Sequence, residues 1–186
     1  MWNKEKIMTV NFKKLGVSDD EIARAMSFGI RYTKSQRNEL KRALNVTPPS
    51  ENDLSSFEKK NKFALSESYR NFLKENNGGI PDKSIFKKND TEYVLDRLLM
   101  FGGNSNAYDS IENHIDVFSS RIPNSTIPIG RSPGGDLFLL KTSGSDCGSV
   151  WYWHHEFESP SNGSAHWENT EKLSSDFGDF LRNLHD

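Results

Sequence analysis

Residues 127–154 read IPIGRSPGGDLFLLKTSGSDCGSVWYWH, and this stretch decides the fold. It holds three short β-prone runs, at residues 127–130, 136–141 and 150–154, of which the last is aromatic. The two segments between the runs are rich in Gly, Ser, Pro and Asp, the residues that hairpin turns need. This pattern predicts three strands that pair in chain order as an antiparallel meander.

Helical patterns lie on both sides of this meander. Ser50 and Ser66 each stand where an N-cap is expected, directly before apolar residues at helical spacing. Residues 111–122 and 173–184 also repeat apolar side chains with the period of a helix, and residues 93–101 form a further strand-like run. We therefore expect an α+β fold with a central antiparallel sheet flanked by helices.

An N-terminal helical extension precedes this unit. Ser18 and Thr33 each open a segment that matches the capping box, in which an acidic or amide residue follows three positions later. Pro48-Pro49 then ends the second helix, because proline cannot continue one. We predict an extension over residues 1–46 and one α+β domain over residues 47–186.

Charge is divided unevenly between these two parts. Residues 1–46 carry ten Lys and Arg against five Asp and Glu, a net charge of +5. Because the whole chain carries −2, the remaining residues carry −7. An acidic body argues against a nucleic-acid partner, since phosphate contacts need a basic face. It suits a basic protein partner, for which complementary charge speeds the encounter.

Targeting and redox signals are few. Cys147 is the single cysteine, so the chain cannot form an internal disulfide, which fits a reducing compartment. No stretch approaches the roughly 20 apolar residues of a membrane span, and the N-terminus lacks the apolar core of a signal peptide. We expect a cytoplasmic protein with no membrane partner.

The aromatic run in residues 150–154 has two interpretations. Alternation along a strand predicts that Trp151 and Trp153 share one face and that Tyr152 lies on the other. Core packing is the commoner role for such a face, and an anchor for a partner protein is the second.

Polar residues follow the aromatic run and include a candidate metal site. His154, Glu156 and His166 carry imidazole and carboxylate groups, which bind Zn²⁺ in hydrolases. Neighbours on a strand face opposite sides, so His154 could share an ion with Glu156 but not easily with His155. A metal-dependent hydrolase therefore stays as an alternative. The simpler interpretation is a polar end to an aromatic strand, with no metal, no cofactor and no catalytic residue.

The order of several motifs resembles the SUKH superfamily, which includes fungal cell-wall-synthesis regulators and many bacterial toxin-immunity proteins. Residues 65–73, LSESYRNFL, and 77–81, NGGIP, resemble the helix and the NGG-x-P turn of that group. Further similar motifs follow in the same order at residues 127–130, 135–136, 150–156 and 177–181. The resemblance covers residues 47–186. One departure is Leu65-Ser66, where the family usually has Leu-Pro; Ser also starts helices.

The resemblance implies a single α+β domain that binds and neutralises a toxin, in many members a nuclease, and it implies no catalytic residue. We expect an immunity protein that occludes the active site of a cognate toxin, or binds another basic protein, through an acidic surface. An intracellular regulatory scaffold that uses residues 1–46 as a docking arm is the main alternative. Charge and expected exposure select the candidate contacts Asp109, Glu112, Asp116, Asp136, Asp146 and Glu156.

Overall fold

A computed structural model of the chain describes residues 10–102, 108–157 and 167–186. Its α-helices are α1 (Asp19–Ser27), α2 (Lys34–Arg42), α3 (Glu51–Asn61), α4 (Glu67–Glu75), α5 (Ile111–Phe118) and α6 (Phe177–Arg182). Three antiparallel sheets accompany them, so the predicted α+β class is confirmed. Among the described helices, none has the length and apolar character that crossing a membrane requires.

The largest sheet is a five-stranded meander. Its strands pair in chain order: β5 (Arg97–Leu98), β6 (Thr126–Arg131), β7 (Leu137–Lys141), β8 (Val150–Trp153) and β9 (Thr170–Ser174). The three predicted strands are its central members. The turn between β6 and β7 closes with a hydrogen bond of 2.9 Å from the Ser132 N–H to the Asp136 carbonyl, as the Pro-Gly-Gly sequence there favours.

Two smaller sheets complete the domain. One orders β10 (Leu184–His185), β3 (Ile85–Lys88) and β4 (Thr91–Val94), so the last described strand pairs with an early hairpin. The other pairs β1 (Phe12–Lys13) with β2 (Ile80–Pro81) and ties the N-terminal extension to the domain.

The meander has a core on each face. The main core places Tyr152 and Phe138 of the sheet against buried side chains of α3, α4 and α6. The second core joins Trp153 and the partly buried Trp151 with Leu137, Leu139 and Ile122. The predicted alternation of the aromatic strand is therefore confirmed, and Trp153 is fully buried.

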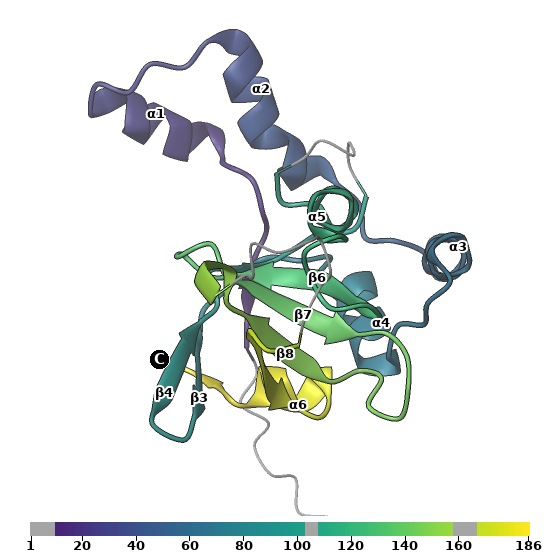
Figure 1. Ribbon diagram of the computed structural model, residues 1–186. Helices are drawn as coiled ribbons and strands as arrows, with labels where there is room; N and C mark the ends of the chain where they lie inside the picture. The colour runs from purple at the N-terminus through teal and green to yellow at the C-terminus, as the bar shows by residue number, and fades with distance from the viewer. Residues whose placement is uncertain (1–9, 103–107, 158–166) are drawn as a thin grey trace, which may run out of the picture.

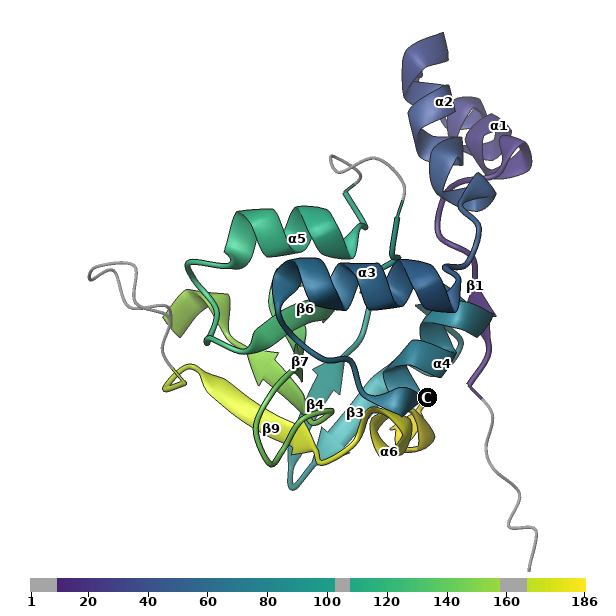
Figure 2. The same ribbon diagram turned by 90° about the vertical axis from the view of Figure 1, so that its right-hand side faces the viewer.

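The two helices of the extension project away from the rest of the molecule (Figures 1 and 2). Both begin with the predicted capping boxes, Ser18 with Glu21 and Thr33 with Gln36. Ser50 caps α3 through a further box with Asp53. These capping boxes can be predicted from the sequence because the two residues of each box are only three positions apart.

Four expected elements differ from the structure. The helix expected over residues 111–122 ends at Phe118. Residues 173–184 do not form one helix: Leu173 belongs to β9, and Asp176 then caps the shorter α6 by accepting from the Gly178 and Asp179 N–H groups. Residues 93–101 divide into β4 and β5. The aromatic strand ends at Trp153, and the 3₁₀ helix η2 (His155–Phe157) follows.

The Asn-Gly-Gly turn after α4 needs its residue types. Asn77 and Gly78 have φ of 50° and 82°, in the left-handed region that Asn and Gly adopt most readily. A Cβ on Gly78 would lie 2.8 Å from the Leu99 backbone. The turn therefore lets α4 end directly against the strand region that follows.

Candidate functional site

A groove lies between α3 and α5. The two helices run side by side, end-on in Figure 1 and lengthwise in Figure 2. The groove has a volume of about 440 Å³. Its lining residues are Asp53, Ser56, Phe57, Lys60, Asn61, Phe101, Glu112, Ile115 and Asp116. Three carboxylates and one ammonium line it, so its net charge is negative.

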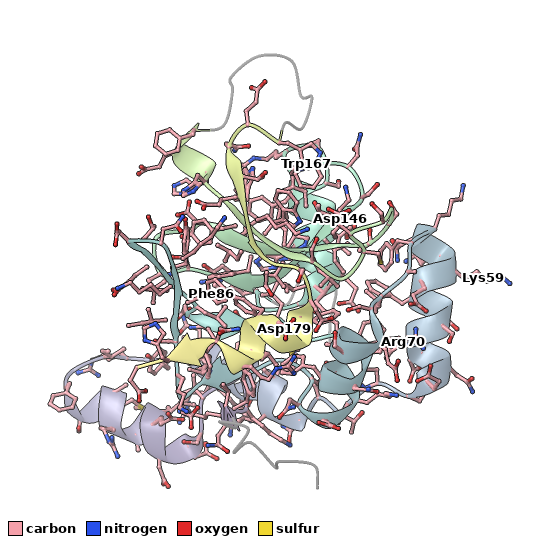
Figure 3. The ribbon with its side chains drawn as sticks, turned by 90° about the horizontal axis from the view of Figure 1, so that it is seen from below. Lys59, Arg70, Phe86, Asp146, Trp167 and Asp179 are labelled. Atoms are coloured by element: carbon pink, nitrogen blue, oxygen red, sulfur yellow. The ribbon has the colours of Figure 1, made fainter. Side chains whose placement is uncertain are left out.

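Ion pairs with α4 hold helix α3 in position. Arg70 of α4 pairs with Glu58 and Glu51 of α3, and Lys74 reaches Glu51 at 3.1 Å. Figure 3 shows Arg70 beside α3, whereas Lys59 projects from the outer side of that helix. Leu54 and Phe57 bury the inner face of α3 in the main core. The face of α3 that carries Asp53, Ser56 and Lys60 forms one wall of the groove.

Glu112 is the central carboxylate of the opposite wall. Ser110 caps α5 through a 3.0 Å hydrogen bond from the Asn113 N–H, which sets Glu112 in the first turn. The Glu112 Oε1 atom accepts from the Gly102 N–H at 2.9 Å. Its Oε2 atom is buried and has no hydrogen-bond partner among the described residues. Within the described part of the chain, one oxygen of this carboxylate is thus satisfied and the other is not.

The electrostatic environment of Glu112 reflects that burial. Burial raises its pKa above the ordinary value, and the hydrogen bond from Gly102 and the charge of Lys60 oppose the shift. The charge of Asp116, one turn along α5, acts in the same direction as burial. The buried Tyr69 hydroxyl also lacks a partner among the described residues, and burial and the charge of Glu112 raise its pKa.

The other two carboxylates stand nearer the solvent. Asp53 and Asp116 are exposed, one on each wall. Asp53 also accepts the Ser50 N–H at 2.8 Å and the Ser50 hydroxyl at 2.6 Å. These hydrogen bonds hold the pKa of Asp53 below its ordinary value, so it carries its charge at neutral pH.

The floor of the groove is apolar. The rings of Phe57 and Phe101 meet edge to face with centroids 5.0 Å apart, and Ile115 lies beside them. The Asn77 amide holds the Phe101 backbone, with Nδ2 donating to its carbonyl at 2.9 Å and Oδ1 accepting from its N–H at 2.8 Å. The Asn-Gly-Gly turn thus positions the floor.

The six predicted contact residues do not form one surface. Glu112 and Asp116 come together in the groove, and Asp136 bonds to His155 of η2, the helix that carries Glu156. Asp109 is engaged inside the protein, since its carboxylate accepts from Arg97 at 3.1 Å and lies 3.7 Å from Arg131. Asp146 is in the loop after β7, 3.9 Å from the Lys172 ammonium. Glu156 is exposed on η2.

Asp136 has a structural role. Its carboxylate accepts from the Tyr152 hydroxyl at 2.8 Å and from the backbone and ring nitrogens of His155 at 3.0 and 2.6 Å. Burial opposes its ionisation, but these hydrogen bonds outweigh burial and lower its pKa. Asp136 therefore joins the β6–β7 turn to η2.

The hydrolase alternative receives no geometric support from the described residues. Among them, no three His, Cys, Asp or Glu side chains lie close enough to hold a metal ion. His166 lies outside the described residues. His154 packs its ring against Tyr152 with centroids 4.9 Å apart, and the strand alternation that would align it with Glu156 ends at Trp153.

Sequence reasoning missed three important residues of the groove. Asp53 is recognisable in the sequence only as the third residue of a capping box, and Phe57 and Phe101 only as core residues. No local signal places them opposite Glu112, because 59 residues separate Asp53 from Glu112 along the chain. The packing of α3 on α4 brings these walls together.

Comparison with known proteins places the groove within a recognised region. The model of a family described as SMI1 / KNR4 family (SUKH-1) matches residues 48–183, which include every residue that lines the groove. One relative is the SPbeta prophage-derived uncharacterized protein YokK of Bacillus subtilis (strain 168), 35% identical over 60 residues. That match covers 32% of this chain and 30% of the length of the relative.

Proposed function

Because the chain belongs to the SMI1 / KNR4 family (SUKH-1), we propose that it is a non-catalytic immunity protein that binds and neutralises a cognate toxin. The resemblance drawn from the ordered motifs between residues 65 and 181 is confirmed by the family match over residues 48–183. The binding site in this proposal is the acidic groove between α3 and α5. The observation that carries it is the Oε2 atom of Glu112, which is buried and has no partner in residues 10–102, 108–157 and 167–186.

Glu112 favours a cationic ligand group. An unsatisfied buried carboxylate oxygen costs about 1–3 kcal/mol, which a donor from a partner would recover. Arg presents several N–H donors in a planar fork that matches a carboxylate, and it keeps its charge when desolvated. A basic side chain that enters the groove would pass the exposed Asp53 and Asp116, one on each wall, and would reach the buried Glu112 between them.

The floor favours the same kind of ligand. Phe57, Phe101 and Ile115 offer apolar contact to the aliphatic part of a long basic side chain, and the aromatic faces attract a guanidinium. Binding energy at protein interfaces concentrates at such small, desolvated pockets that receive an Arg or an aromatic anchor.

The charge of the domain fits a toxin that acts on nucleic acid. Such a protein needs a basic face for phosphate contacts, and residues 47–186 carry −7. Complementary charge accelerates association and orients the partners. An immunity protein that covers the basic face of a nuclease would prevent its substrate from binding.

The test is binding to, and protection against, the toxins encoded beside this chain, by isothermal titration calorimetry and survival of toxin-expressing cells. We expect Asp116→Lys to weaken binding at least tenfold, since it places a like charge at the groove entrance. Glu92→Lys is the matched control, because Glu92 is exposed on β4, and the β3–β4 hairpin lies at the opposite end of the domain from α5 (Figures 1 and 2).

Comparison of the two variants tests whether the groove is the binding site. Loss of binding with Asp116→Lys but not with Glu92→Lys would support the groove. The absence of binding to any neighbouring toxin, or equal binding by the two variants, would contradict the proposal. Proton linkage gives a second measurement: a cation beside Glu112 favours its charged form, so affinity should rise as the pH rises through the pKa of Glu112. The Glu112→Gln variant should not show this dependence.

A further inference from the structure

The end of α1 and the turn that leads to α2 expose three large apolar side chains. Met26 is 41% exposed, Phe28 82% and Ile30 49%. The described residues expose five other large hydrophobic side chains, and those are spread over separate elements. We call the segment of residues 24–34 the tip, since it joins the two helices that project from the molecule (Figures 1 and 2).

All charged side chains of the tip are basic. Residues 22–38 contain Arg24, Arg31, Lys34 and Arg37 and no Asp or Glu. The acidic residues of this extension lie mainly at its base, where Asp19 pairs with Lys41 and Glu21 pairs with Lys13. The segregation leaves apolar and positively charged groups together at the outermost part of the molecule.

The base of the extension is packed, so the tip is held in place. The Val17 N–H donates to the Leu40 carbonyl at 2.9 Å, which joins the start of α1 to α2. Leu15 and Met100 form a small core with Ala43, Val46 and Ile80, so both ends of the extension contact the domain. The exposure of Phe28 is therefore a feature of a structured element, not of a free tail.

We propose that this tip docks on an anionic membrane surface. This revises the expectation of no membrane partner, which rested on the lack of a membrane-spanning stretch, because peripheral docking needs no such stretch. Met26, Phe28 and Ile30 would enter the boundary between headgroups and acyl chains, while Arg24, Arg31 and Lys34 contact anionic headgroups. A bilayer of this kind supplies both requirements of the tip, an apolar phase and a negative surface, within one interface. A nucleic acid supplies the negative charge without the apolar phase, and exposed Phe, Met and Ile gain nothing from phosphate.

This docking is independent of the acidic groove, which lies between other elements. The protein then has two binding surfaces of opposite charge: the groove binds a basic protein, and the tip binds an acidic membrane. One molecule can therefore bind a toxin and a membrane at the same time. The attachment would be peripheral and weak, because a short apolar patch with few cations gives reversible binding.

Sedimentation of the full chain with phospholipid vesicles tests the proposal. We expect association with vesicles of equal parts phosphatidylcholine and phosphatidylglycerol, and none with phosphatidylcholine alone. Phe28→Ser should lower the partition coefficient about tenfold, the loss that removing one inserted aromatic side chain produces. The double variant Arg24→Gln/Arg31→Gln should also weaken association, and added salt should weaken it further.

Matched controls come from the β3–β4 hairpin. Val94→Ser removes another exposed apolar side chain, and Lys87→Gln removes another exposed charge. Neither should change vesicle binding. Circular dichroism of each variant separates a lost contact from a lost fold.

Three results would overturn the proposal. The first is no association of the folded wild-type chain with phosphatidylglycerol vesicles. The second is equal association of wild type and Phe28→Ser, which would mean that the apolar tip does not enter the bilayer. The third is a dimer in light scattering that Phe28→Ser dissociates, which would assign the tip to a second copy of the chain. None of these measurements involves a toxin, so they leave the groove proposal unaffected.

Discussion

Asn77 and Phe101 hold each other through paired hydrogen bonds between a side-chain amide and a backbone. The Asn77 Nδ2 atom donates to the Phe101 carbonyl at 2.9 Å, and its Oδ1 atom accepts from the Phe101 N–H at 2.8 Å. A third bond of 3.3 Å runs from Nδ2 to the Thr47 carbonyl. One side chain at the end of α4 thus joins the start of the domain to the floor of the groove.

Removal of this amide should destabilise the domain. Asn77→Gly keeps a residue that tolerates the left-handed backbone but leaves the Phe101 and Thr47 groups without their partner. The expected loss in the free energy of unfolding is about 1–3 kcal/mol, measured by urea denaturation. Asn89→Gly is the control, because Asn89 has a similar φ of 53° but is exposed. Equal stability of the two variants would show that the amide contributes little.

Gly78 and Gly29 form a second matched pair. Both have a left-handed φ, of 82° and 91°, but a Cβ on Gly78 would lie 2.8 Å from the Leu99 backbone, whereas Gly29 has no atom within 4 Å of that position. Gly29→Ala should cost only the conformational penalty of about 1–2 kcal/mol. Gly78→Ala should cost at least about 1–3 kcal/mol more in thermal unfolding, since backbone must move. Equal melting temperatures would contradict the close approach.

Glu112→Gln should change the pH dependence of stability. Burial raises the pKa of Glu112 in the folded state, so its protonated form favours folding, and that contribution is lost as the pH rises through the folded pKa. Gln keeps an acceptor for the Gly102 N–H and does not ionise. The melting temperature of the variant should therefore exceed that of wild type at neutral pH, and the difference should shrink as the pH falls. A constant difference at every pH would contradict this assignment.

His114 should make the fold sensitive to mild acid. Burial lowers its pKa below the ordinary 6.5, the charge of Arg131 adds to the effect, and the hydrogen bond to the Ser110 carbonyl and the charge of Asp109 oppose it. The unfolded chain then binds the proton more readily, so stability falls as the pH drops below about 6.5. In His114→Asn, whose amide can donate to the same carbonyl, the decline in melting temperature between neutral pH and about pH 5 should be smaller. An identical decline would assign it to other groups.

Local patterns predicted the elements whose partners are near in sequence. Both capping boxes of the extension, the central strands of the meander and the alternation of Trp151, Tyr152 and Trp153 all agree with the structure. The predicted closing helix was wrong at both ends, because Leu173 of β9 and Leu184 of β10 fit the helical period by coincidence. In the structure Leu173 faces the main core from a strand, and Phe177 and Phe180 face the same core from α6.

By itself, the sequence determined the α+β class, the basic extension on an acidic domain and the family motifs, since composition, period and turn chemistry are local properties. Only the tertiary structure decided which acidic residues act together. It paired Asp109 with arginines, used Asp136 to join the β6–β7 turn to η2, and set Glu112 and Asp116 opposite Asp53. A carboxylate becomes a structural ion pair or a binding group according to what packs against it, and those neighbours come from distant parts of the chain.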